Sequence, residues 1–267
     1  MLFHAKNSRI PIGDTGMNYI SFGRGPQNLI LIPGLGDGLR SVRGLALPFA
    51  AMYRCLVKDY TVYSFSRRDH LPMGFTTRDM ASDLAYAMKE AGIKKAHILG
   101  VSQGGMIAQY LAIDLPELVD KLVLTVTAPC QNETIQSVIP RWINMADKKD
   151  YKGIMIDTAE KSYTEAYLKK MRPMYRFMSN IGAPKSYSRF LVMATACITH
   201  DATSELSRIT APTLIIGGGV DQIVSGKASE DLADLIANSE LYIYKDYGHG
   251  LYEEAPDFIK RVTSFLG

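Results

Sequence analysis

The amino-acid sequence predicts an α/β fold with a mostly parallel sheet flanked by helices. Short continuous apolar runs recur along the chain, and segments of helical periodicity lie between most of them. Continuous apolar runs are typical of strands covered on both faces, and their alternation with helices is typical of a doubly wound sheet. The chain has 267 residues, of which 47% are hydrophobic, so we expect one large core rather than several small ones.

An antiparallel hairpin is expected to open this sheet. Strand-like segments cover residues 9–12 and 17–22, and Gly13 and Asp14 between them suit a tight turn. The further runs that we expect as parallel strands are residues 29–32, 61–65, 96–99, 122–126, 213–216 and 241–244. Loops that follow such strands meet at the carboxyl edge of the sheet, where ligands of these folds bind.

The helical segments divide the chain into a core and an insertion. Helical periodicity covers residues 77–91, 103–114, 225–237 and 256–266. Between Cys130 and Arg208 the sequence keeps a helical pattern but offers no convincing strand. We therefore expect a core of residues 1–129 and 209–267, with residues 130–208 inserted as a helical cap.

A candidate nucleophile lies between an expected strand and an expected helix. Gly100-Val101-Ser102-Gln103-Gly104 matches the pattern G-x-S-x-G at this junction. A sharp turn there would expose the serine, and side chains larger than glycine at Gly100 and Gly104 would collide. The start of the following helix favours the negative charge that develops on an attacked carbonyl oxygen. Ser102 is therefore the predicted nucleophile, with a helix-capping serine as the alternative interpretation.

A serine nucleophile needs a base and a carboxylate that orients the base. His249 follows the last expected strand between two glycines and is the predicted base, with His200 as the rival. Asp221 follows the strand at 213–216 and a run of three glycines, so it is the predicted carboxylate. Asp246 is the minor alternative, because it lies only three residues before His249 and its side chain would reach the ring of His249 poorly.

The segment Pro33-Gly34-Leu35-Gly36-Asp37-Gly38 follows an expected strand at the same edge of the sheet. It can present the N–H of Leu35, which together with the N–H of Gln103 would form an oxyanion hole. A phosphate-binding glycine loop is the competing interpretation. The spacing disfavours it, because Leu39 stands where a dinucleotide fingerprint needs glycine and no G-K-[ST] follows.

Composition excludes several classes of function. Thirty basic and 27 acidic side chains give a net charge of +3, and no long run of one sign indicates a nucleic-acid groove or a membrane-binding arm. The three cysteines are far apart and form neither a zinc pattern nor a disulfide framework. Without a membrane span or signal segment, we expect a cytoplasmic protein whose partner is a small molecule. The sequence does not determine its oligomeric state.

Ser102, Asp221 and His249 in this chain order, with the Pro33–Gly38 segment before them, resemble the α/β-hydrolase superfamily along essentially the whole chain. The resemblance implies an eight-stranded sheet, a cap over the site, and acyl-enzyme chemistry that needs no cofactor or metal. Two positions depart from the common pattern. Pro33 stands where a histidine often precedes the oxyanion glycine, and residues 66–70 replace the usual D-x-R-G-x-G loop.

The resemblance also narrows the reaction. Relatives that are haloalkane dehalogenases or epoxide hydrolases carry an aspartate at the position of Ser102, which disfavours both activities here. We expect a carboxylic ester hydrolase acting on a small or medium, largely apolar ester. One alternative is a carbon–carbon bond hydrolase, although these often carry an aromatic residue at the position of Gly250. The other is a ligand-binding member of the superfamily without turnover.

Overall fold

The computed structural model describes the backbone of residues 2–178 and 182–267, and the side chains of the same residues except 174–178. Its centre is the predicted sheet, which has eight strands in the order β1-β2-β4-β3-β5-β6-β7-β8. The strands are β1 (Lys6–Ile12), β2 (Thr15–Gly23), β3 (Gln27–Ile32), β4 (Tyr60–Arg68), β5 (Ala96–Val101), β6 (Val119–Thr125), β7 (Thr213–Gly218) and β8 (Ser239–Tyr244). Each contains or overlaps a strand expected from the sequence.

The first strand pair forms the predicted antiparallel hairpin. Ile10 of β1 pairs with Met17 of β2, and Gly13 in the turn has a φ of +57°, a conformation that glycine adopts without strain. β2 pairs antiparallel with β4, and every pairing from β4 to β8 across the sheet is parallel. The carboxyl ends of β3, β5, β7 and β8 therefore lie along one edge.

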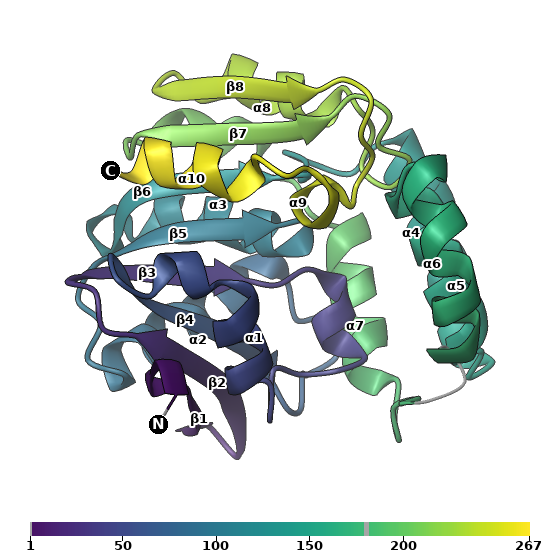
Figure 1. Cartoon of the computed structure of the whole chain (residues 1–267), viewed down its shortest axis with the longest axis horizontal. Coiled ribbons are helices and arrows are strands. Elements are labelled where there is room, and N and C mark those ends of the chain that lie inside the picture. Colours follow the sequence, from purple (N-terminus) through teal and green to yellow (C-terminus); the bar gives the residue numbers. More distant parts are fainter. Residues whose placement is uncertain (1, 179–181) are drawn as a thin grey trace.

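Helices cover both faces of the sheet (Figure 1). One layer consists of α2 (Thr77–Glu90), α3 (Gln103–Asp114) and α8 (Ala228–Leu235), and the other of α1 (Ala46–Met52), α9 (Leu251–Glu254) and α10 (Phe258–Leu266). Helices α1 and α9 were not predicted from the sequence, because they are too short to show a helical period. α8 begins later than the predicted helix at 225–237, because Ser225 has a φ of 79°, which no helical residue adopts.

The residues between β6 and β7 form helices beyond the carboxyl edge of the sheet (Figure 1). They are α4 (Glu133–Asp147), α5 (Tyr151–Ser162), α6 (Glu165–Met178) and α7 (Ser188–Ile198). The two ends of this segment meet, because Cys130 and Asp201 form an isolated antiparallel bridge. α7 packs against α4 and against residues 35–38 after β3, so it lies between the other helices and the sheet. Among the described residues, no helix is long and apolar enough to span a membrane.

The two faces of the sheet pack separate apolar layers. Ile30 and Ile98 face the layer of α2 and α3, while Leu29 and Leu99 face the layer of α10. All four side chains are at most 5% exposed. Because both faces are covered, the strands appear as continuous apolar runs in the sequence.

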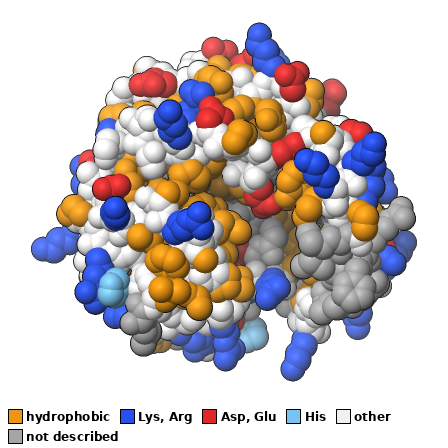
Figure 2. All heavy atoms as spheres, viewed as in Figure 1, with side chains coloured by type: hydrophobic (Ala, Val, Ile, Leu, Met, Phe, Trp, Pro, Cys, Tyr) orange, Lys and Arg blue, Asp and Glu red, His pale blue; other side chains and the backbone are white. Residues whose placement is uncertain are grey.

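Part of α1 is nevertheless exposed, and Figure 2 shows apolar side chains gathered on the surface over this helix.

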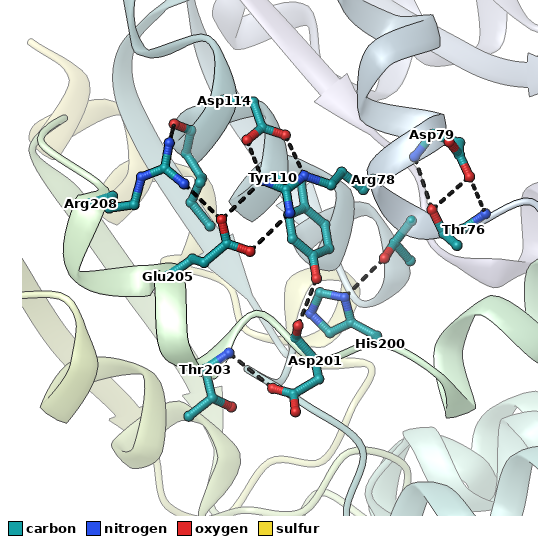
Figure 3. A network of polar contacts seen from close by, with 12 residues as sticks. Thr76, Arg78, Asp79, Tyr110, Asp114, His200, Asp201, Thr203, Glu205 and Arg208 are labelled. Carbon is teal, nitrogen blue, oxygen red and sulfur yellow. Dashed lines mark hydrogen bonds and ion pairs between the residues drawn. The ribbon is translucent and has the colours of Figure 1, made fainter.

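A polar network joins α2 and α3 to the chain that returns from the insertion (Figure 3). Arg78 forms ion pairs with Asp114 and Glu205 and lies 4.9 Å above the ring of Tyr110. His200 is 2% exposed and packs edge-on against Tyr110. Its Nδ1 lies 2.9 Å from the hydroxyl of Thr77, and burial lowers its pKa to about 4. His200 is therefore a neutral structural side chain at ordinary pH.

This burial makes the stability of the fold depend on pH. The folded pKa of His200 is about 4 against an ordinary value of 6.5. The buried, neutral imidazole makes its full contribution to the free energy of unfolding above pH 6.5. This contribution is lost as the pH falls toward 4, because the unfolded chain then binds a proton that the folded chain excludes. The expected loss is about 3 kcal/mol in the free energy of unfolding.

Urea unfolding of wild type and His200→Gln across this pH range measures the effect. The variant is expected to be less stable at pH 8 but to lose less stability on acidification. His70→Gln, in the exposed loop after β4, is the matched control and should follow wild type. An unchanged acid slope in His200→Gln would show that other groups cause the acid loss.

Candidate active site

Ser102 occupies a sharp turn between β5 and α3. Its φ of 55° and ψ of −123° lie outside the regions that most side chains adopt. Such backbone strain costs roughly 1–3 kcal/mol and persists only where the surroundings enforce it. Here the close packing of α3 on β3 enforces it: a Cβ on Gly104 would lie 2.0 Å from the carbonyl oxygen of Ile32, and one on Gly100 would lie 2.5 Å from the oxygen of Gly104.

The loops after β7 and β8 bring Asp221 and His249 together. Nδ1 of His249 lies 2.8 Å from Oδ2 of Asp221, whose side chain is 1% exposed. The other carboxylate oxygen accepts hydrogen bonds from the N–H groups of Ile223 and Val224, at 2.8 and 3.0 Å. This carboxylate is thereby fixed and can accept a hydrogen bond from a protonated Nδ1 of His249, which leaves Nε2 available as a base.

The structure also places the two rival residues. Asp246 is exposed on the loop before His249, which already pairs with Asp221. His200 is buried against Thr77 and Gln109. Neither rival is among the described residues that line the cavity at Ser102.

Ser102 and His249 line one cavity of about 520 Å³. Its walls are mainly apolar and come from both sides of the site. Residues from the insertion include Ile135, Ile139, Trp142, Ile154, Met155 and Phe190, and residues from the sheet face and its helices include Leu31, Phe49, Met52, Leu99, Tyr252 and Ile259. Among the described lining residues there is no lysine or arginine, whereas Glu253 contributes a carboxylate. Asp37 also lines the cavity, but its carboxylate is paired with Arg189. The cavity is therefore suited to a neutral, largely apolar molecule.

The N–H groups predicted to bind an oxyanion belong to Leu35 and Gln103. Leu35 begins a short 3₁₀ helix (Leu35–Gly38) after β3, and Gln103 is the first residue of α3. Within the described part of the chain, neither N–H has a hydrogen-bond partner. Gly34, next to Leu35, approaches Ser102 so closely that a Cβ there would lie 3.2 Å from the Cβ of the serine. These two elements are therefore adjacent at Ser102.

Sequence reasoning missed the role of Asp37, which anchors this loop from within. Its carboxylate accepts hydrogen bonds from the hydroxyl of Ser66, at 2.6 Å, and from the backbone N–H of Arg67, at 2.9 Å. It also pairs with Arg189 of α7, and its side chain is 1% exposed. Residues 33–38, which carry the predicted oxyanion donor of Leu35 and are called the oxyanion loop below, are thus tied both to β4 and to the insertion. An aspartate between two glycines was the available signal in the sequence.

Two further buried groups lie behind the predicted oxyanion hole. Arg67 donates to the carbonyl oxygen of Pro33 at 2.6 Å, and burial lowers its pKa to about 10. The side-chain amide of Gln103 donates to the carbonyl oxygen of Met193 at 2.6 Å and to Sγ of Cys197 at 3.1 Å. Burial raises the pKa of the Cys197 thiol to about 12. This thiol is therefore protonated and inert at ordinary pH, so it does not compete with Ser102 as a nucleophile.

Known proteins resemble the chain along most of its length. A 2-hydroxy-6-oxononadienedioate/2-hydroxy-6-oxononatrienedioate hydrolase of Klebsiella pneumoniae is 28% identical over 268 residues, covering 91% of this chain and 88% of that protein. A pimeloyl-(acyl-carrier protein) methyl ester esterase of Vibrio parahaemolyticus is 23% identical, with coverage of 94% and 98%.

Solved structures show the same fold. The enol-lactonase from Burkholderia xenovorans matches with a TM-score of 0.82 at 20% identity, covering 97% of this chain and 99% of its own. A family model described as the alpha/beta hydrolase fold matches residues 27–256. This match covers well over half of the sequence and includes Ser102, Asp221 and His249. The chain therefore belongs to the α/β-hydrolase family.

Proposed function

We propose that the protein is a serine hydrolase that cleaves neutral, largely apolar carboxylic esters. The observation that carries this proposal is the Asp221–His249 hydrogen bond of 2.8 Å beside a cavity that both His249 and the strained Ser102 line. The hydrolases among the curated relatives support the reaction class. The mainly apolar lining of the cavity supports an apolar substrate.

The proposed reaction has two halves. In the first, Oγ of Ser102 attacks the ester carbonyl carbon while Nε2 of His249 takes the serine proton, and the oxyanion rests on the N–H groups of Leu35 and Gln103. The intermediate collapses, and His249 passes the proton to the departing alcohol. In the second half, His249 takes a proton from water, which attacks the acyl carbon. Ser102 then leaves with the proton, and the carboxylic acid is released.

We further propose that residues 130–208 act as a cap over this site. Helices α4, α5 and α7 contribute apolar side chains to the cavity wall, and α7 contacts the oxyanion loop through Arg189. A cap in this position would exclude water from the acyl-enzyme except where the cavity opens. It would also fix the size of the substrate.

Carbon–carbon bond hydrolysis is the second candidate. It is favoured by the relative from Klebsiella pneumoniae, whose name is that of a hydrolase of a dienedioate or trienedioate. Such a substrate carries carboxylates, and these need cationic partners when they enter an apolar cavity. The lining carboxylate of Glu253, together with the lack of a lysine or arginine among the described lining residues, favours a neutral ester instead.

Two substitutions and one control test the proposed roles of Ser102 and Asp221. Ser102→Ala is expected to abolish labelling by a fluorophosphonate and to lower ester turnover by a factor on the order of 10⁴ or more. Asp221→Asn is expected to lower kcat by a factor on the order of 10³–10⁴, because the imidazole loses its orienting partner. Asp246→Asn is the matched control and should keep wild-type turnover. Labelling of Ser102→Ala at the wild-type rate would rule out this nucleophile.

The substrate class is tested by turnover of a panel of p-nitrophenyl esters of rising acyl length. We expect neutral esters to be hydrolysed with a clear optimum in chain length, because the cavity has a fixed volume. Esters with a terminal carboxylate on the acyl chain, and ring-cleavage dienedioates, are expected to react poorly. Rapid dienedioate cleavage without ester turnover would favour the carbon–carbon hydrolase. Saturable ester binding without labelling or turnover would instead indicate a binding protein.

The Asp37 anchor is tested by Arg189→Met. This change removes the ion pair between the buried carboxylate and Arg189 and lets the oxyanion loop shift. A displacement of about 1 Å near the reacting atoms lowers rates by roughly 10²-fold. We expect a fall mainly in kcat, with KM nearly unchanged. Arg172→Met is the control, because Arg172 of α6 pairs with Glu160 and Glu165 on the outer side of the insertion. Equal losses in both variants would argue against a specific effect on the oxyanion loop.

A further inference from the structure

Helix α1 has no polar side chain, although part of it faces solvent. Its sequence is Ala-Leu-Pro-Phe-Ala-Ala-Met. Leu47 is 49% exposed and Met52 is 68% exposed, and Pro48 and Ala51 are also exposed. We call these four side chains the α1 patch, and Figure 2 shows apolar side chains gathered over this helix. Adjacent exposed apolar side chains indicate an interaction surface, whereas isolated ones do not.

Cationic side chains flank the α1 patch along the chain. Arg40 and Arg43 precede it, Arg54 and Lys58 follow it, and all four are exposed. No aspartate or glutamate occurs in residues 40–58. Within the described part of the chain, none of the four cations takes part in an ion pair. The segment therefore combines an apolar surface with four positive charges that no protein carboxylate pairs.

Three carboxylates lie near this segment and could oppose its charge. Asp37, before it, is buried and paired with Arg189, so it does not reach the surface. Asp59, directly after Lys58, is exposed and offsets one charge. Burial raises the pKa of Tyr53 to about 12, and the negative charge of Glu253 of α9 adds to this rise, so Glu253 lies close to the end of α1. Glu253 already accepts a hydrogen bond from Tyr163. The balance over residues 40–59 remains positive, at four cations against one anion.

The α1 patch is continuous with the cavity at Ser102. Met52 belongs to the patch and also lines the cavity, and Phe49 and Tyr53, which lie next to it in the chain, line the cavity too. The cavity wall continues from these side chains along Leu31 and Leu99 on the sheet face. An aliphatic chain that passes Met52 would therefore contact apolar side chains along its path to the nucleophile.

We propose that the α1 patch docks on an anionic lipid surface, from which an aliphatic ester enters the cavity past Phe49 and Met52. An apolar helix face with flanking arginines and lysines fits such a surface, because the side chains insert at the headgroup level while the cations pair with anionic headgroups. The cations are spread along the chain on both sides of a short helix, so they do not appear as a basic run in the sequence. Docking does not depend on the proposed ester hydrolysis, but the entry of substrate rests on it.

Vesicle co-sedimentation of the full-length Ser102→Ala protein tests the docking, because this variant cannot change the lipids. We expect binding to vesicles of phosphatidylcholine and phosphatidylserine in equal amounts, and little binding to phosphatidylcholine alone. Arg43→Gln with Arg54→Gln is expected to lower the partition coefficient on the order of tenfold. Leu47→Ser is expected to weaken binding in both low and high salt, whereas the effect of the cations fades with salt.

Matched controls lie elsewhere on the surface. Met73→Ser removes a side chain that is 91% exposed, and Lys94→Gln with Lys148→Gln removes two exposed cations. Both are expected to bind vesicles like the parent protein. Binding without preference for phosphatidylserine, or equal losses in the controls, would overturn the proposal. A dimer that Leu47→Ser dissociates, without vesicle binding by the parent protein, would assign the patch to a second copy of the chain and also overturn it.

Ester turnover separates this proposal from the proposed function. With Ser102 intact, Leu47→Ser should hydrolyse a soluble short ester like wild type, but should lose activity on an ester embedded in anionic vesicles. If wild type binds anionic vesicles yet hydrolyses no ester, the proposed function fails and the docking stands. If wild type hydrolyses soluble esters but does not bind anionic vesicles, the docking fails and the proposed function stands.

Discussion

Ser102 has a positive φ because the chain reverses between β5 and α3 where α3 packs directly on the backbone of β3. The glycines at 100 and 104 permit this contact, and the contact in turn keeps the strained residue in place. The rest of the site is arranged around that turn. The oxyanion loop after β3 lies beside it, and the parallel sheet brings the loops of Asp221 and His249 to the same edge.

A second constraint is the charge of Asp37 in the interior. A buried carboxylate needs several hydrogen bonds or a cation, and here it has both, from Ser66, Arg67 and Arg189. One charged side chain therefore connects the oxyanion loop, the sheet and the last helix of the insertion. Because removing one partner of such a group is costly, this connection couples the geometry of the loop to the position of α7.

Charge is distributed unevenly around the cavity, and the distribution has chemical consequences. The described cavity wall is mainly apolar and includes no lysine or arginine, whereas the exposed cations Arg40, Arg43, Arg54 and Lys58 flank α1 along the chain. A neutral chain can enter such a cavity with little desolvation cost, while a carboxylate cannot. The two surfaces together match an amphiphilic ester, with its aliphatic part inside and an anionic environment outside.

The sequence alone predicted the fold class, the strands, the longer core helices and the position of Ser102 at a strand-to-helix turn. These features depend on local signals: continuous apolar runs, helical periods, and glycines where the backbone must turn tightly. It also pointed to Asp221 and His249, because chain order places both after strands of one sheet. Their catalytic roles, like those of Leu35 and Gln103, stay predictions for experiment.

Other features depend on contacts between residues that are distant in the sequence. The distance between the side chains of Asp221 and His249 shows that Asp221, and not Asp246, is the partner of His249. The pairing of Asp37 with Arg189 joins residues 152 positions apart. The burial of His200 and the exposure of Leu47 and Met52 depend on which neighbours cover each side chain. Periodicity fixes which side of an element is apolar, but only tertiary packing decides whether that side is covered by protein or left to solvent.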